Sequence, residues 1–180
     1  MPPPLDVPLA RVSPLGRPEP WFRHLQWFSG LDHGAYNGLG TGSEYFVPFS
    51  AGPNAIKALL PLAAEIADAT FTVLLRVVAS DDAWMSTANG ANLGGEPLLV
   101  IEFQWIGDKI AELSMLLARI ESALGGFLPR PHWGMLFTMS PSAYLPLYQR
   151  LNDFKRIAHE LDPRGKFRNS FLDEKIFAKI

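Results

Sequence analysis

The spacing of apolar residues changes several times along the chain, and these changes predict four strands. Residues 71–79 are almost all apolar, which is typical of a strand buried on both faces of a sheet. Residues 98–105 place apolar side chains on one face and polar ones on the other toward their end, which indicates a strand with one buried face. Shorter apolar runs predict strands over residues 44–49 and 133–139.

Three other segments repeat their apolar residues every three or four positions and predict helices. The first spans residues 53–68, and Pro61 in its middle is expected to kink it or to begin a shorter helix. The second runs from an Asp108 N-cap to a stop at Gly125, and the third covers residues 141–161. The order β-α-β-β-α-β-α predicts an α+β fold of the ferredoxin-like type, an antiparallel sheet with helices on one face.

The first 20 residues differ from the rest, because they hold seven of the 16 prolines. Proline fixes φ and removes an amide donor, so we expect residues 1–20 to form a poorly ordered lead-in. Residues 21–180 have the size and the apolar content of one domain.

Composition and charge narrow the possible chemistry. The 180 residues include no cysteine, which excludes disulfides, thiolate metal sites and cysteine nucleophiles. The net charge of −2 gives no electrostatic reason to expect nucleic acid as a partner. The four histidines lack metal-site spacing, so no metal is expected. No segment approaches the ~18 apolar residues that cross a bilayer, and no signal peptide is evident, so a cytoplasmic location is the default expectation.

One charged residue interrupts the apolar strand at residues 71–79. Arg76 needs a partner if it is buried, and Glu102 and Gln104 share one face of the strand that follows. In an antiparallel pair Arg76 and Glu102 lie nearly opposite, so we predict an ion pair between them. The alternative is that Arg76 points to solvent at a sheet edge.

Three motifs, in this order along the chain, resemble a known family. They are GSEYFVP at residues 42–48, RPHWGMLFT at 130–138 and LDPRGKFRNSFL at 161–172. They resemble the C-terminal half of the flavin-dependent sugar-alcohol and aldonolactone oxidases, the alditol oxidase and D-arabinono-1,4-lactone oxidase group. The resemblance covers roughly residues 20 to 173.

The resemblance implies a cap that carries the substrate pocket of an FAD-dependent oxidoreductase. Such enzymes take a hydride from an alcohol carbon to FAD and pass the electrons to oxygen. The FAD-binding domain is expected to be absent from this chain, which would then need a separate FAD-binding partner or would form a homo-oligomer. The implied substrate is a sugar alcohol or an aldonolactone. The alternative is a non-catalytic binding or dimerisation module derived from that cap.

Departures from the family weaken the expectation of activity. Arg76 matches a substrate-site arginine and is the candidate catalytic residue, whereas the glutamate, histidine, threonine, lysine and glutamine that the family places around the substrate are replaced. Their positions are occupied here, in that order, by Leu74, Glu102, Gln104, Met135 and Gly42. Each lost hydrogen-bond partner costs about 1–3 kcal/mol, so we expect the chain alone to be inactive.

The resemblance also suggests cofactor contacts. His132 and Trp133 would shape the wall near the flavin, and Lys166 and Asn169 would hold the C-terminal turn against the FAD domain. The alternatives are a packed tryptophan beside a histidine with its hydrogen bonds satisfied, and a solvated turn over residues 162–165. Asp81 and Asp82, beside Ser80, are interpreted as turn or capping residues rather than as an acid pair.

Overall fold

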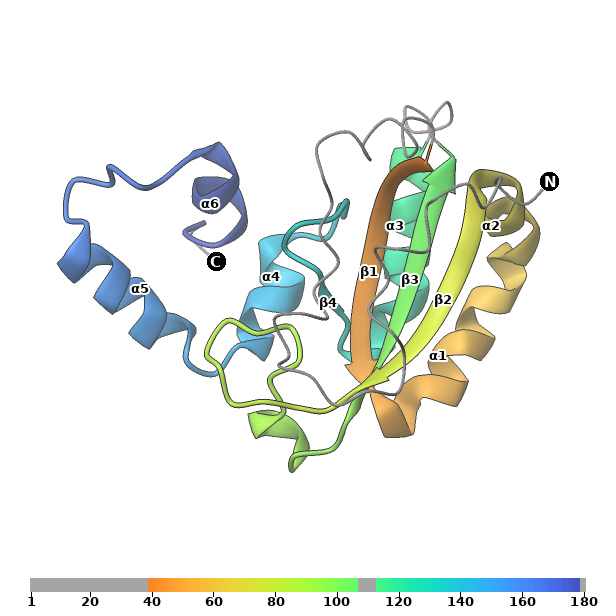
Figure 1. Cartoon of the computed structure of the whole chain (residues 1–180), viewed down its shortest axis with the longest axis horizontal. Helices are drawn as coiled ribbons and strands as arrows, with labels where there is room; N and C mark the ends of the chain where they lie inside the picture. The colour runs from red at the N-terminus through yellow and green to blue at the C-terminus, as the bar shows by residue number, and fades with distance from the viewer. Residues whose placement is uncertain (1–38, 107–112, 179–180) are drawn as a thin grey trace, which may run out of the picture. The chain divides into compact units, whose positions relative to one another are not determined.

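A computed structural model of the chain describes residues 39–106 and 113–178. The expected lead-in at residues 1–20 and the Asp108 N-cap lie outside these residues. The described strands form one antiparallel sheet in the order β2-β3-β1-β4 (Figure 1). Their bounds are β1 Leu39–Pro48, β2 Thr70–Val78, β3 Leu98–Ile106 and β4 Arg130–Pro131. This strand order is the ferredoxin-like arrangement, and the predicted α+β fold is confirmed.

Helices from two parts of the chain cover one face of this sheet. The first pair follows β1 and is divided by a short 3-10 turn at Leu60–Leu62, where Pro61 removes an amide donor as predicted. The third helix follows β3 and stops before Gly125, also as predicted. The bounds are α1 Gly52–Leu59, α2 Ala63–Ala69 and α3 Leu113–Leu124.

The core lies between these helices and the sheet. Alternate residues of β1 and β3 point into it, and Tyr45 pairs in register with Ile101. Two pairs of polar side chains are hydrogen-bonded within this core. Trp105 Nε1 donates to Ser43 Oγ at 2.8 Å, and Tyr45 Oη donates to Glu121 Oε1 at 2.8 Å. These four side chains therefore satisfy one another inside the core and need no ligand.

The prediction that residues 71–79 form a strand buried on both faces is wrong. β2 pairs with β3 alone among the described strands, so it lies at the sheet edge. Leu75 is 53% exposed and Val77 is 58% exposed. An apolar sequence indicates that a strand can be buried, but the position of the strand in the sheet determines whether it is buried.

Two further predictions needed correction at the C-terminal end. The strand expected at residues 133–139 is replaced by a tight turn, in which Met135 N donates to His132 O at 3.2 Å. The strand beside β1 is only Arg130–Pro131, and after the turn Leu136 N makes one more bond to β1, to Gly42 O at 2.9 Å. The helix expected over residues 141–161 is divided at a 3-10 turn that contains Pro146. The resulting helices are α4 Pro141–Tyr144 and α5 Leu151–Leu161, and they are followed by an unpredicted helix, α6 Ser170–Lys175.

Candidate functional site

A cluster of charged residues lies on the face of the sheet that points away from α1, α2 and α3, here called the outer face. Strand register places it there, since Glu44 on β1 pairs with Glu102 on β3, and Glu102 also pairs with Leu74 on β2. Gly42 pairs with Gln104, two residues further along each of the same two strands. Residues paired across neighbouring strands share a face, so positions far apart in the sequence meet here.

Arg76 connects the two glutamates. Its Nη2 lies 2.8 Å from Glu102 Oε2, which confirms the predicted ion pair, and it also contacts Glu44 Oε1. Glu44 is only 4% exposed, whereas the side chain of Arg76 is 51% exposed. One guanidinium thus pairs with two buried carboxylates and can balance only one of their two negative charges. Sequence reasoning missed Glu44.

His132 borders this cluster. Its backbone N donates to Glu44 O at 2.9 Å, and its ring stacks on Phe46. Nδ1 accepts a hydrogen bond from Gly134 N at 3.0 Å, so the neutral ring carries its proton on Nε2, which lies 3.9 Å from Glu44 Oε2. Burial, and then the charge of Arg76, lower the pKa of His132, while Glu102 opposes them. The neutral form is therefore favoured.

Residues at the substituted family positions surround the glutamates. Gln104 Nε2 donates to Glu102 Oε1 at 3.1 Å. A side chain at Gly42 would begin 3.5 Å from Met135 Sδ, so Met135 lies beside the space that a larger residue at position 42 would need. Leu74 lies opposite Glu102. The outer face thus has acceptors at its centre and apolar or small residues at its border.

The four residues suggested as cofactor contacts do not gather at one place. Trp133 Nε1 donates to Met85 O at 2.9 Å, and its ring packs against Tyr144 and Tyr148. Asn169 Oδ1 accepts from Leu172 N at 2.9 Å and caps α6.

Lys166 donates its backbone N to Asp162 Oδ1, and its Nζ lies 5.9 Å from the centre of the Phe167 ring. Among these four residues, His132 alone borders the outer-face cluster. Within the described part of the chain, no hydrogen bond or ring contact joins Lys166 or Asn169 to His132 or Trp133.

Asp81 has a structural role, whereas the turn role expected for Asp82 stays a prediction. Asp81 accepts hydrogen bonds from Ala83 N at 3.0 Å and from Ser86 Oγ at 2.6 Å, which confirms its predicted turn role. No group of three or more metal-ligating side chains occurs among the described residues. None of the helices in residues 39–106 and 113–178 has the length and apolar character needed to cross a membrane.

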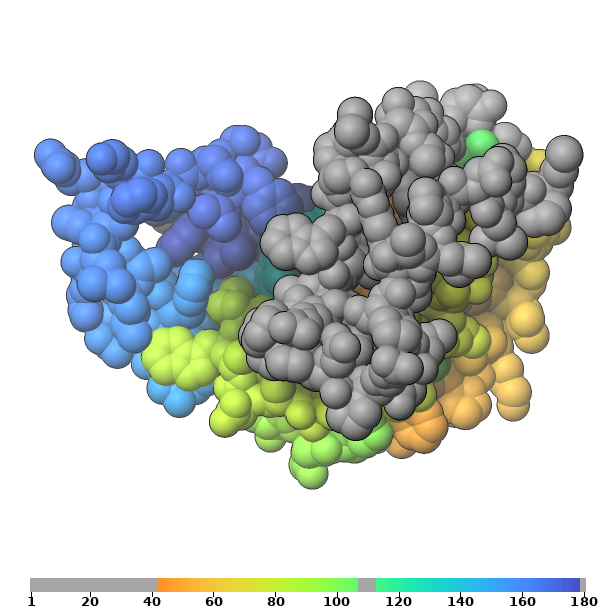
Figure 2. Space-filling model, viewed as in Figure 1, coloured from red at the N-terminus to blue at the C-terminus, as the bar shows by residue number. Residues whose placement is uncertain are grey.

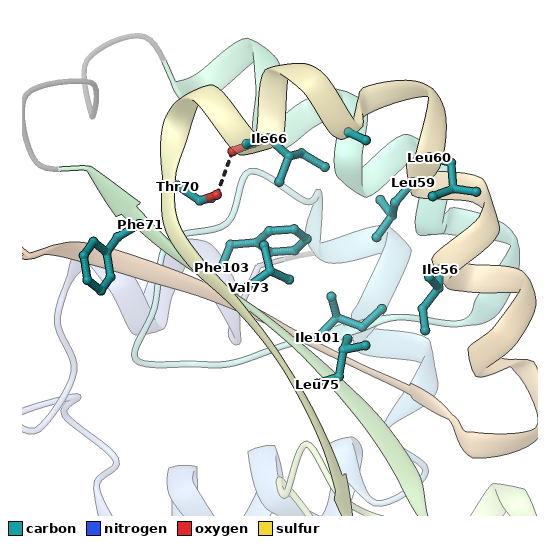
Figure 3. A pocket seen from close by; sticks show the side chains of 12 residues that line it. Ile56, Leu59, Leu60, Ile66, Thr70, Phe71, Val73, Leu75, Ile101 and Phe103 are labelled. Atoms are coloured by element: carbon teal, nitrogen blue, oxygen red, sulfur yellow. Dashed lines mark hydrogen bonds between the residues drawn. The ribbon is translucent and has the colours of Figure 1, made fainter. Parts of the chain in front are cut away.

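A second feature is an apolar groove of about 440 Å³ between α1, α2 and the edge of the sheet (Figure 3). Ile56, Leu60 and Ile66 line it from the helical side. Val73 and Leu75 of β2 line it from the sheet. It lies on the helix-facing side of the sheet, so the charged cluster does not border it.

Comparison with known proteins agrees with the motifs. The sequence signature of D-arabinono-1,4-lactone oxidase matches residues 41–175. An alditol oxidase from Streptomyces sp. (strain IKD472 / FERM P-14339) is 36% identical over 157 residues, which are 87% of this chain and 36% of that protein.

A long-chain alcohol oxidase from an uncultured marine euryarchaeote is 30% identical over 103 residues, which are 56% of this chain and 21% of that protein. The chain therefore spans about a third of the length of the first relative and about a fifth of the second.

Proposed function

This chain belongs to the D-arabinono-1,4-lactone oxidase family, and on that premise we propose that its outer face is the substrate-binding surface of an oxidoreductase of the alditol oxidase type, acting on CH–OH donors. The observation that carries this proposal is the convergence on one face of positions 42, 74, 76, 102 and 104 from three strands, with Met135 beside them. The resemblance to the family implies substrate contact for these same positions.

The two glutamates suit a hydroxylated ligand. An ionised carboxylate only accepts hydrogen bonds and has about four lone-pair sites, so Glu44 and Glu102 together offer more acceptors than Arg76 and Gln104 fill. Alcohol hydroxyls are the matching donors. In this proposal Arg76 fixes the spacing of the carboxylates, and His132 holds a proton on Nε2 at the border of the site.

The flavin that this family uses would supply the hydride acceptor. Since no hydrogen bond or ring contact joins Lys166 and Asn169 to His132 and Trp133, we propose that any FAD is held mainly by a separate FAD-binding domain or partner chain. The loss of the family's lysine at Met135 and of its glutamate at Leu74 removes polar substrate contacts. We therefore propose that the chain by itself does not oxidise sugar alcohols.

The test is to titrate the purified chain with a sugar alcohol, an aldonolactone and a long-chain alcohol while following side-chain amide signals by NMR. At least one ligand is expected to move the Gln104 amide signal in the wild type and much less in Arg76→Met. Arg119→Met is the matched control, because it breaks an exposed ion pair with Glu65 elsewhere. If none of the three alcohols moves outer-face signals, the proposal is wrong.

The same preparation, with and without added FAD, addresses the cofactor. A visible flavin spectrum that stays with the chain through gel filtration would overturn the proposal that FAD is held elsewhere. A colourless chain that still binds an alcohol is the expected result. Peroxide release is then assayed to test for oxidation.

A second candidate is a non-catalytic dimerisation module, and the exposed edge strand favours it. β2 exposes Leu75 and Val77, and among the described strands only β3 pairs with it, so one edge of β2 is open. An open strand edge is a common template for pairing with another strand. In that case Val77→Lys converts a dimer to a monomer in sedimentation experiments. A wild-type chain that is monomeric at all concentrations tested excludes this candidate.

A further inference from the structure

We propose that Arg130 and Tyr148 form a binding site for one oxyanion, the head of a carboxylate or a phosphate. Arg130 lies on β4 and Tyr148 follows α4, so the pair joins the edge of the sheet to the C-terminal part of the chain. The site uses none of the outer-face residues assigned to the substrate, and it does not depend on the proposed oxidoreductase function.

The first observation is that Arg130 is buried without a hydrogen-bond or ion-pair partner among the described residues. The side chain is 4% exposed, and its Nη1 has no hydrogen bond. Among the described residues it forms no ion pair either, whereas Arg76, Arg119, Arg150, Arg156 and Arg168 all do. A buried guanidinium that lacks an acceptor is costly, and native structures seldom leave one so.

The second observation is that Tyr148 repeats this anomaly in the adjacent side chain. Tyr148 is 3% exposed, and its hydroxyl has no hydrogen bond. In the described part of the chain, these two atoms are the buried side-chain nitrogen and oxygen atoms left without a partner. Arg130 Cζ lies over the Tyr148 ring, 5.8 Å from its centre, so the two side chains that carry the unsatisfied donors are neighbours.

The surrounding side chains supply no acceptor. Tyr144, whose ring also packs against Trp133, donates its hydroxyl to Lys175 O at 2.8 Å and is satisfied. Asp81 is close enough to affect Arg130 electrostatically, but no hydrogen bond or ion pair joins the two side chains, and the donors to its carboxylate are Ala83 N and Ser86 Oγ. Asp81 therefore offsets part of the charge of Arg130 and leaves its N–H groups unpaired.

The missing group is consequently an acceptor, and the charge of Arg130 favours an anionic one. Carboxylate and phosphate oxygens match a guanidinium and a phenol O–H geometrically and electrostatically. Residues 80–97 carry Asp81 and Met85 and lie at the molecular surface (Figure 2), and Met85 O accepts from Trp133 beside Tyr148. The head of a ligand held beneath this segment would give both donors a partner.

The test is thermal unfolding of the full chain in sodium acetate, sodium phosphate and sodium chloride at matched ionic strength. For a bound anion the Tm is expected to rise by about 3 to 6 °C for each tenfold excess over the Kd. Tyr148→Phe removes one donor with little change in packing and is expected to lose most of this rise. Tyr144→Phe is the matched control and is expected to keep it.

Phosphate raises the Tm of most proteins without binding to a specific site. Comparing the rise in Tm of the wild type with that of each variant separates this general effect from binding at Arg130 and Tyr148. A rise with acetate alone identifies a carboxylate ligand, and a rise with phosphate alone identifies a phosphoryl ligand. Arg130→Lys, which keeps the charge and loses the fork of donors, is expected to weaken either response. If the wild type and Tyr148→Phe respond equally to all three salts, the two donors are satisfied by water and the proposal is wrong.

Discussion

Buried carboxylates occur on both faces of the sheet, and their surroundings differ. On the helix-facing side, Glu121 of α3 accepts hydrogen bonds from Tyr45 Oη, from Thr138 N at 2.7 Å and from Thr138 Oγ1. Burial, followed by the Glu121 charge, raises the pKa of Tyr45, which keeps this donor protonated. On the outer face, Glu44 and Glu102 instead share one guanidinium.

The difference distinguishes a carboxylate that stabilises the fold from carboxylates that are available to bind a ligand. Three neutral donors satisfy Glu121 from within the chain, so a ligand would have to displace them. The outer-face pair has fewer donors than acceptor sites, and its main partner, Arg76, is half exposed. We therefore expect substitution of Glu121 to affect stability most and substitution on the outer face to affect ligand binding most.

The largest effect is expected for Glu121→Ala. It leaves Tyr45 Oη and Thr138 N without an acceptor in the core, and we expect a loss of about 3 kcal/mol in the free energy of unfolding. Urea denaturation measures it. Glu160→Ala on α5 removes an exposed glutamate that is paired with Arg156 and should change stability by less than about 1 kcal/mol. Equal effects of the two substitutions would contradict the distinction between the faces.

An intermediate effect is expected for Arg76→Met. It leaves two buried carboxylates side by side, and we expect a loss of about 2 kcal/mol in the free energy of unfolding. The double variant Arg76→Met with Glu102→Gln should recover part of that loss, because only one charge then remains on the outer face. Arg119→Met, with its exposed partner Glu65, is the control in the same urea series. If the double variant is less stable than Arg76→Met, the two carboxylates do not repel each other as argued.

Local sequence pattern was sufficient for the strand faces and the ion pair. Alternation places Arg76 and Glu102 on corresponding faces of consecutive strands, and a hairpin pair brings such faces together. The same alternation puts Glu44 and Phe46 on one face of β1. The local sequence pattern does not predict that β1 pairs with β3, and Glu44 was missed for this reason. The pairing of Glu44 with Glu102 depends on contacts between segments far apart in the sequence.

Tertiary context decided the features that sequence reasoning got wrong. The second strand of a ferredoxin-like sheet is an edge strand, so the predicted topology already conflicted with the prediction that β2 is buried on both faces. At residues 133–139 the apolar content favoured a strand, while Gly134 N bonds to His132 Nδ1 and forms a turn instead. The partnerless donors of Arg130 and Tyr148 depend on packing and have no sequence signal.

The smallest effect concerns His132 and pH. Its pKa lies below the ordinary value of 6.5 in the fold, chiefly because of burial and then because of the charge of Arg76. At a pH between the lowered pKa of the folded chain and the ordinary value of 6.5, His132 is protonated more in the unfolded chain than in the folded one. The stability that the fold has above pH 6.5 is therefore partly lost as the pH falls from 6.5 toward the lowered pKa. NMR titration of the His132 ring measures the pKa directly, and Arg76→Met is expected to move it upward. A pKa that does not respond to Arg76→Met would remove His132 from the electrostatic unit of the outer face, and with it the argument that this face acts as one site.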